Sequence, residues 1–422
     1  MSAATIIADI AKRARIAART LAASSGAERN QLLLNIADEL EKNLDLILKA
    51  NQLDMDAAKS AGIYSSLQDR LLLTEKRVKE MAAATRDIAK LTDPLGKILV
   101  ERNLDNGLNL KQKSVPFGVV GMVYEARPNV TVDAAVILIK SGNAALLRGS
   151  STAANSNQAL ITVMKKAFVN TKISAEVLQI IPSDDRATAT ALLTARGLVD
   201  LVIPRGSAQL IRSVIDEATV PTIETGAGVC HVYVDKSADL EKAVAILINS
   251  KCDRPSVCNA AETLLVHQDI AEKFLPIALN ALTSAGVIIN VDNASKVIAD
   301  KLNIKVNSAN EESWSTEYGS LEINVAQVSD VMDAIDHIAK YGTNHTEAIV
   351  AEDKEVISIF TSLNDCAAIM VNASTRFTDG GQMGFGAEIG ISNQKLHARG
   401  PMGLEQMTTT TWIVSGNGQI RQ

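Results

Sequence analysis

Residues 117–148, FGVVGMVYEARPNVTVDAAVILIKSGNAALLR, contain the pattern that decides the fold. A short apolar run, Gly118–Tyr124, is followed by a helical segment, Val130–Lys140, and then by a second apolar run, Ala144–Leu147. Strands that alternate with helices of this length form right-handed βαβ units, and such units build a parallel sheet. The stretch therefore predicts an α/β fold.

The same alternation continues toward the C-terminus in two series, which meet near Gly226–Gly228. Further strands are predicted at Val177–Ile181, Leu198–Ile203, Val229–Val234, Thr263–Val266, Gly286–Ile289, Ala348–Ala351, Ala367–Val371 and Thr408–Val414. Helices are predicted at Thr152–Phe168, Asp184–Thr194, Ser207–Asp216, Leu240–Asn249, Ile270–Leu282, Val331–Lys340 and Glu355–Ser362. The residues before position 90 are predicted to be helical, because apolar side chains recur there at helical spacing. We therefore expect two α/β halves.

The composition supports this fold class and excludes several functions. With 422 residues, the chain is long enough for two or three domains of roughly 100–200 residues each. Only 3% of the residues are aromatic, so the core must consist of small aliphatic side chains, which suit buried parallel strands. A net charge of −6 without a long basic block argues against a general nucleic-acid binder. No apolar run approaches the roughly 18 residues of a membrane span, so we expect a cytoplasmic protein that does not bind membranes.

The four cysteines are too few for a disulfide scaffold, and their spacing matches no standard metal motif, so no metal is expected. Cys258 differs from the others because Lys251 and Arg254 lie close in sequence, and cationic neighbours favour a reactive thiolate. A small buried core residue is the alternative for Cys258. Cys230 and Cys366 fit that alternative better, because both lie in apolar runs.

Several motifs in order along the chain resemble one protein family. These are YEARPN at Tyr124–Asn129, RPSVCN at Arg254–Asn259 and HARGP at His397–Pro401, with NASTRFTDG at Asn372–Gly380 and GFGAEIG at Gly384–Gly390. Together they resemble the gamma-glutamyl phosphate reductase branch of the aldehyde dehydrogenase superfamily, over nearly the whole chain. No glycine-rich dinucleotide fingerprint or P-loop motif is present.

The resemblance implies an aldehyde dehydrogenase-like fold, with two parallel-sheet α/β domains and a small β element for oligomerisation. Residues 1–104 and 117–225 would form the NADPH-binding domain, and residues 226–395 the catalytic domain. Residues 105–116 and 396–422 would supply the oligomerisation hairpin and the C-terminal strand. A homo-oligomer is therefore expected.

The resemblance also implies an oxidoreductase. Its reaction would be the NADPH-dependent reduction of L-glutamyl 5-phosphate to L-glutamate 5-semialdehyde with release of phosphate, in proline biosynthesis. The substrate is a small anionic molecule, and a functional association with glutamate 5-kinase would fit the unstable acyl phosphate. One alternative is a phosphate-independent aldehyde dehydrogenase that uses Glu224 as its base. Another is a cysteine acyltransferase or hydrolase without a nicotinamide cofactor, although no histidine has a recognisable triad context.

By the resemblance, Cys258 is the nucleophile that forms a thioester. The side-chain amide of Asn129, together with the backbone N–H of Cys258, would stabilise the oxyanion. A helix N-cap is the alternative for Asn129. For Glu224, the alternative to a catalytic role is a residue at a helix–strand junction.

Cofactor contacts are implied for five residues. Arg148 follows a predicted strand, and Ser151 stands where relatives that prefer NAD often carry an acid, so a 2′-phosphate is favoured. Gly206 and Ser207 match the turn that contacts the pyrophosphate, at a predicted helix N-terminus. Glu317 would bind the nicotinamide ribose, with a solvated loop acid as the alternative.

Three arginines are candidates for the anionic groups of the substrate: Arg127, Arg254 and Arg399. A guanidinium group binds phosphate or carboxylate through two parallel hydrogen bonds. Pairing with a structural carboxylate is the alternative for each of them.

Overall fold

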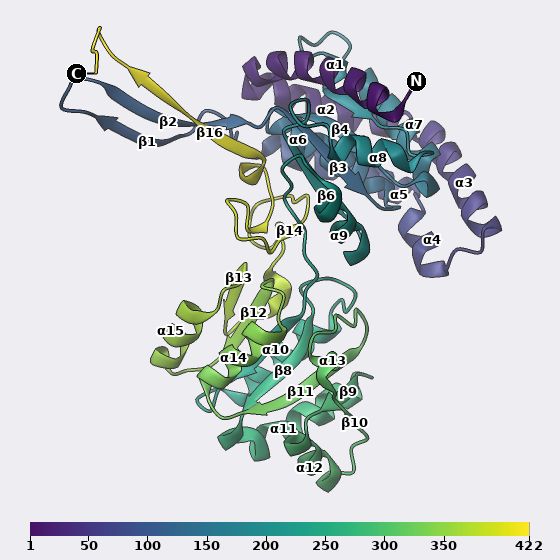
Figure 1. Cartoon of the computed structure of the whole chain (residues 1–422). Helices are drawn as coiled ribbons and strands as arrows, with labels where there is room; N and C mark the ends of the chain where they lie inside the picture. The colour runs from purple at the N-terminus through teal and green to yellow at the C-terminus, as the bar shows by residue number, and fades with distance from the viewer. Residues whose placement is uncertain (422) are drawn as a thin grey trace. The chain divides into compact units, whose positions relative to one another are not determined.

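The computed structural model describes residues 1–421, without the side chains at positions 65, 66 and 208. The chain divides into two compact units (Figure 1). Unit 1 comprises Met1–Glu224, Gly384–Gly390 and Met402–Gln422, and unit 2 comprises Thr225–Met383 and Ile391–Pro401. Within residues 1–421, no helix combines the length and the apolar character needed to cross a membrane.

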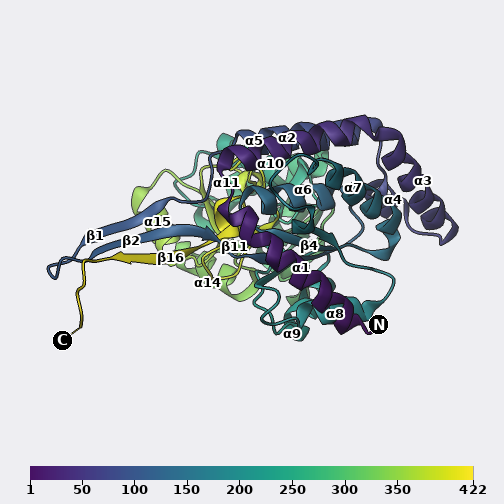
Figure 2. The same ribbon diagram turned by 90° about the horizontal axis from the view of Figure 1, so that it is seen from above.

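Unit 1 contains a parallel four-stranded sheet with the strand order β5-β4-β3-β6. Helices α6 and α7 lie on one face of this sheet, and α1 and α8 lie on the other (Figure 2). The strands of this sheet are β3 (Val119–Tyr124), β4 (Ala144–Arg148), β5 (Leu178–Ile180) and β6 (Leu201–Arg205). The helices are α1 (Ala3–Ala23), α2 (Gly26–Lys42), α3 (Leu44–Ser60), α4 (Ser65–Leu71), α5 (Glu75–Lys90), α6 (Pro128–Lys140), α7 (Ala154–Lys166), α8 (Arg186–Leu193) and α9 (Ala208–Glu217).

A separate antiparallel sheet of unit 1 contains β1 (Ile98–Asn103), β2 (Asn109–Pro116) and β16 (Thr408–Ser415), in the order β1-β2-β16. The three strands extend away from the helices of unit 1 (Figures 1 and 2). A hairpin that pairs with the C-terminal strand is confirmed, but its first strand, β1, precedes the expected start at residue 105. β16 presents exposed apolar side chains such as Trp412 and Val414. A role for this sheet in oligomerisation stays a prediction.

Unit 2 contains a parallel seven-stranded sheet in the order β10-β9-β11-β8-β7-β12-β13. Its strands are β7 (Cys230–Val234), β8 (Ala261–His267), β9 (Ile288–Val291), β10 (Asn307–Ser308), β11 (Glu322–Val328), β12 (Thr346–Val350) and β13 (Ala368–Val371). Its helices are α10 (Leu240–Cys252), α11 (Gln268–Ser284), α12 (Asn293–Lys301), α13 (Glu311–Trp314), α14 (Val331–Tyr341) and α15 (Lys354–Leu363). The two-residue strands β14 (Ile391–Ser392) and β15 (Gly400–Pro401) pair separately.

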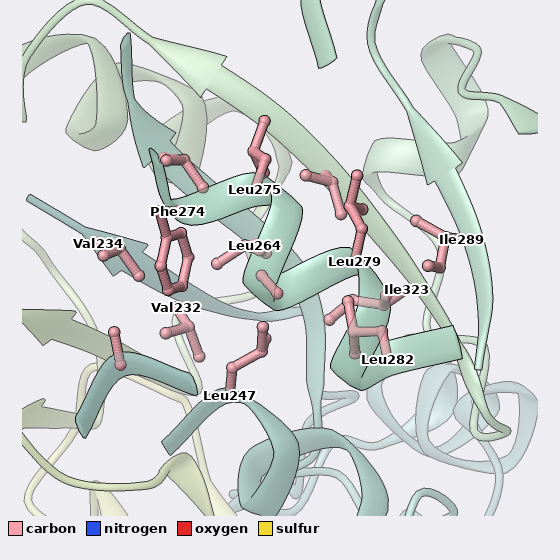
Figure 3. Close-up of a cluster of buried hydrophobic side chains, with 14 of the residues drawn as sticks. Val232, Val234, Leu247, Leu264, Phe274, Leu275, Leu279, Leu282, Ile289 and Ile323 are labelled. Carbon is pink, nitrogen blue, oxygen red and sulfur yellow. The ribbon is translucent and has the colours of Figure 1, made fainter. Parts of the chain in front are cut away.

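Both faces of the unit 2 sheet are buried. Helix α11 packs Phe274, Leu275 and Leu279 against strand residues such as Leu264 and Ile323 (Figure 3). On the opposite face, α14 and α15 cover a second apolar cluster. Strands buried on both faces are continuous apolar runs, which is why the sequence pattern predicts most of them.

The structure differs from the sequence-based predictions in three respects. β6 begins at Leu201 rather than Leu198, because the preceding residues form a turn in which Val199 N donates to the Ala195 carbonyl. β11 and α12 are additional elements that the sequence patterns do not predict. The segment Gly384–Gly390 groups with unit 1, whereas the expected catalytic domain runs unbroken to residue 395. Backbone hydrogen bonds that link this segment to Met402 account for its placement.

Candidate active site

Cys258 lies in a loop of residues 253–260 between α10 and β8, here called the nucleophile loop. Two successive turns form it: Val257 N donates to the Arg254 carbonyl at 3.4 Å, and Ala260 N donates to the Val257 carbonyl at 3.0 Å. Pro255 is the second residue of the first turn, where its fixed φ is favoured. Cys258 is the second residue of the second turn and is partly buried.

Arg376 holds both ends of the nucleophile loop. Its Nε lies 3.2 Å from Asp253 Oδ2, and its Nη1 donates to Asn259 Oδ1. The amide of Asn259 in turn donates to the Thr378 carbonyl at 2.9 Å. Sequence reasoning missed this role of Arg376, and its position within the C-terminal motif was the only signal that could have indicated it.

The backbone of Cys258 packs closely against β7. The thiol of Cys230 donates to the Cys258 carbonyl oxygen at 3.2 Å. Burial raises the pKa of the Cys230 thiol well above its usual value, so the thiol keeps the proton that it donates. Gly228 faces the same carbonyl, and a Cβ added at this position would lie 1.4 Å from the Cys258 oxygen. The expectation that Cys230 is a buried structural residue is confirmed.

Burial lowers the pKa of two histidines of unit 2 and so favours their uncharged form. Burial lowers the pKa of His345 to about 4 and that of His337 to about 3. Nδ1 of His345 lies 3.9 Å from the Cys230 sulfur and 2.8 Å from Thr346 Oγ1. These contacts place His345 beside the structural Cys230 thiol, and its low pKa makes it a weak base for a cysteine hydrolase.

Glu317 is exposed in the turn that precedes β11. In this turn Gly319 adopts a φ of +60°, and its N–H lies 3.4 Å from the carboxylate of Glu262, the second residue of β8. The nucleophile loop also precedes β8, and Gly228 precedes β7. The candidate residues of unit 2 on these loops are therefore gathered at the amino ends of adjacent strands.

Asn129 lies in the first turn of α6. The N-cap of α6 is Arg127, whose side chain makes no capping hydrogen bond, so the alternative role of Asn129 as an N-cap is wrong. Asn129 is exposed, and its Nδ2 donates to Asp133 Oδ2 at 3.0 Å. Burial raises the pKa of Asp133 to about 6, although the Asn129 hydrogen bond and the charge of Arg205 lower it.

Arg148 ends β4, at the carboxyl edge of the unit 1 sheet. Burial lowers its pKa, and its Nε is buried without a hydrogen-bond partner in the part of the chain that the structure describes. Ser151 is exposed and begins a short 3₁₀ turn before α7. The buried carboxylate of Asp54 accepts hydrogen bonds from the backbone N–H groups of Asn155 and Ser156 in the first turn of α7, directly after this 3₁₀ turn, a role that sequence reasoning missed.

Ser207 is the N-cap of α9 and accepts from Leu210 N, as the predicted helix start requires. Its hydroxyl also donates to Glu125 Oε1 at 2.5 Å. Gly206 lies against the same carboxylate, and a Cβ at this position would be 2.7 Å from the carboxyl carbon of Glu125. The turn after β6 is therefore tied to the turn after β3, which is its neighbour in the sheet.

The three candidate substrate arginines differ in their surroundings. Arg127 and Arg254 are exposed, and Arg254 belongs to the nucleophile loop. Arg399 pairs with Asp365 at 2.7 Å, so it has one carboxylate partner, and its role in substrate binding stays a prediction. The Nε and Nη2 atoms of Arg399 are nevertheless buried without a partner among the described residues.

The structure therefore brings the sequence-predicted residues together in two groups. Those of unit 1 lie at or just after the carboxyl ends of its strands: Arg127, Asn129, Arg148, Ser151, Gly206 and Ser207. Those of unit 2 are Arg254 and Cys258 in one loop, Glu317 in the turn before β11, and Arg399 in the segment before β15. Glu224 is the last residue of the first segment of unit 1 and is partly buried.

Comparison with known proteins identifies the family of the chain. Residues 2–320 match the model of the aldehyde dehydrogenase family. Gamma-glutamyl phosphate reductase of Thermobifida fusca is 50% identical over 412 residues, which cover 98% of each chain. The crystal structure of gamma-glutamyl phosphate reductase from Thermotoga maritima is 43% identical, with a TM-score of 0.96 over 98% of this chain and 99% of that one. Glyceraldehyde-3-phosphate dehydrogenase of Methanocaldococcus jannaschii, solved with NADP, shares the fold at 16% identity, with a TM-score of 0.67 over 99% of this chain and 95% of that one.

The fold and the cysteine loop define a member of the aldehyde dehydrogenase family, an oxidoreductase family whose members use a nicotinamide cofactor. Within this family, the chain belongs to the gamma-glutamyl phosphate reductases.

Proposed function

We propose that this protein reduces L-glutamyl 5-phosphate to L-glutamate 5-semialdehyde with NADPH and releases phosphate, in proline biosynthesis. The observation that carries the proposal is Cys258 in a loop that Arg376 and Cys230 hold from two sides. A cysteine that is fixed through its backbone and its neighbours is preorganised for attack on a carbonyl carbon.

In the proposed reaction, the thiolate of Cys258 attacks the acyl carbon, the bond to phosphate breaks, and a thioester remains on the protein. The Asn129 amide and the backbone N–H of Cys258 would stabilise the oxyanion, and removal of one such donor costs about 10²–10³ in rate. Asn129 Nδ2 carries two hydrogens, and Asp133 engages only one of them. Asp133 thus fixes the direction of the remaining donor.

The unit 1 residues fit a phosphorylated dinucleotide. The orphaned Nε of Arg148 supports a 2′-phosphate contact, and Ser151 adds no negative charge there. Gly206 and Ser207, in the turn that opens α9, would contact the pyrophosphate, and Glu317 would hold the nicotinamide ribose. NADPH, when bound, would supply the hydride that reduces the thioester.

The remaining parts of the proposal concern the substrate and the assembly. Arg127, Arg254 and Arg399 would bind the anionic groups of the substrate, with Arg399 shared between the substrate and Asp365. The exposed apolar side chains of β16 support a homo-oligomer, because an unpaired strand edge favours pairing with a second copy. A cytoplasmic location and a functional association with glutamate 5-kinase complete the proposal.

Phosphate dependence in the reverse direction tests the proposed reaction. We expect NADP reduction with glutamate 5-semialdehyde to require inorganic phosphate, and Cys258→Ala to abolish it. The matched control is Cys252→Ala, since Cys252 ends α10 outside the nucleophile loop and packs against the apolar core. Equal rates with and without phosphate would reject the acyl-phosphate assignment in favour of a phosphate-independent dehydrogenase.

A further inference from the structure

A fully buried ion pair joins the two ends of the nucleophile loop. Lys251 lies in the last turn of α10, and Glu262 is the second residue of β8. Lys251 Nζ lies 2.6 Å from Glu262 Oε2, and neither side chain has any exposed surface. The pair therefore closes the base of the loop that carries Cys258.

Stabilisation of unit 2 is a weak explanation for a buried ion pair. Removing two charges from water costs several kcal/mol per ion, which offsets much or all of their attraction. Burial accordingly raises the pKa of the Glu262 carboxyl, and the charge of Lys251 opposes that rise. Apolar side chains of similar volume would stabilise the fold as well, but they would not hold two particular atoms in one orientation.

The second carboxylate oxygen of Glu262 points to another part of the candidate site. Glu262 Oε1 lies 3.4 Å from Gly319 N, and the charge of Glu317 acts on the same carboxyl group. The exposed Glu317 is the residue for which the proposed function assigns a contact with the nicotinamide ribose. One buried carboxylate at the start of β8 thus contacts both the end of α10 and the turn 317–319.

We propose that Lys251 and Glu262 are positioning residues that hold the nucleophile loop and the turn 317–319 in fixed register, so that Cys258 and the cofactor ribose are correctly spaced. This inference rests on the proposed function, in which Cys258 carries the thioester and Glu317 binds the ribose. Neither Lys251 nor Glu262 touches the substrate, and both act through the loop and the turn.

The test replaces the pair as a whole, so that no unpaired charge is left buried. In Lys251→Met/Glu262→Leu we expect a melting temperature close to that of the wild type. We expect kcat of the reverse reaction to fall about 10- to 100-fold, with KM for phosphate changed by less than about threefold. NADPH binding, followed by its fluorescence, should weaken. The control is Lys301→Met/Glu272→Leu, which removes an exposed ion pair between α12 and α11 and should leave all of these values unchanged.

A readout without substrate separates this inference from the proposed function. The rate at which iodoacetamide alkylates Cys258 should change at least about threefold in Lys251→Met/Glu262→Leu and not in the control. If the wild type lacks phosphate-dependent activity, the proposed function fails, and the alkylation and NADPH-binding measurements still test the pair. The positioning role would be overturned if the double variant folds and keeps the kcat, the alkylation rate and the NADPH affinity of the wild type. If neither the double variant nor Glu262→Gln folds, the pair is needed for folding itself and the positioning role is rejected.

Discussion

Replacing Gly228 by Ala should displace the nucleophile loop while leaving the protein folded. The added Cβ would lie 1.4 Å from the carbonyl oxygen of Cys258 and 2.4 Å from its carbonyl carbon. Real Cβ contacts are essentially never closer than 3.0 Å, so one of the two backbones must move by about 1.6 Å, the difference between 3.0 and 1.4 Å. If the Cys258 backbone moves, its carbonyl oxygen also leaves the 3.2 Å contact with the Cys230 thiol.

The size of this movement sets the expected effect on activity. A misplacement of about 1 Å costs on the order of 10²-fold in rate when a reacting group must be held in a near-attack geometry. We therefore expect kcat of the reverse reaction to fall by at least about 10²-fold in Gly228→Ala. Overpacking of this kind lowers the free energy of unfolding by about 1–3 kcal/mol, which a domain of this size tolerates.

The assay is NADP reduction with glutamate 5-semialdehyde and phosphate, with circular dichroism as the check on folding. The matched control is Gly381→Ala, because Gly381 is exposed and its added Cβ would meet only the flexible carboxylate of Asp379, at 3.1 Å. The control should keep wild-type kcat. If folded Gly228→Ala retained kcat within about threefold of the wild type, the position of the Cys258 backbone would not limit the reaction and the reasoning would be refuted.

Three further variants test other parts of the site. Glu224→Gln should change kcat by less than about threefold, because the phosphate-dependent reaction needs no water-activating base; complete loss would favour the phosphate-independent alternative. Burial raises the pKa of Asp133 to about 6, so the folded state favours the protonated form and the wild type loses stability as the pH rises from about 4 to 6. Asp133→Asn avoids this loss, and its side-chain oxygen still accepts the hydrogen bond from Asn129. Its free energy of unfolding in urea should therefore exceed that of the wild type by about 1–3 kcal/mol above pH 6, and by less at pH 4. A difference that does not depend on pH would contradict the assignment. Arg148→Ala should weaken NADPH binding at least about tenfold and NADH binding less, as measured by fluorescence titration; equal losses would exclude a 2′-phosphate contact.

Local patterns predict most of the sheets because parallel strands buried on both faces are continuous apolar runs. β11 is not predicted in this way, because the polar residue Asn324 interrupts its apolar run. The structure satisfies this buried amide through Tyr318 Oη, which donates to it at 2.9 Å, and through the Ser313 carbonyl, which accepts from it at 2.8 Å. A polar residue whose partners come from another element interrupts the apolar pattern, so periodicity alone does not reveal the strand.

The residues of the candidate site likewise fall into those that sequence motifs indicate and those that only the structure reveals. Cys258 and Asn129 lie within short motifs that can be recognised from the sequence, whereas their supporting residues have no such signal. Arg376 reaches the nucleophile loop from more than a hundred positions away along the chain. A charged residue has the same appearance in the sequence whether it is solvated or buried against a partner, as Lys251 illustrates.

The sequence by itself determined the α/β class, the family and the cysteine that stands out among four, because these depend on local periodicity and on motifs of adjacent residues. Only the tertiary structure decided what holds that cysteine. It showed that Lys251 is buried and paired with Glu262, and that Gly228 and Cys230 pack against the Cys258 backbone. The physical reason is that burial and pairing depend on which strands become neighbours in a sheet, and neighbours in a parallel sheet are distant in sequence.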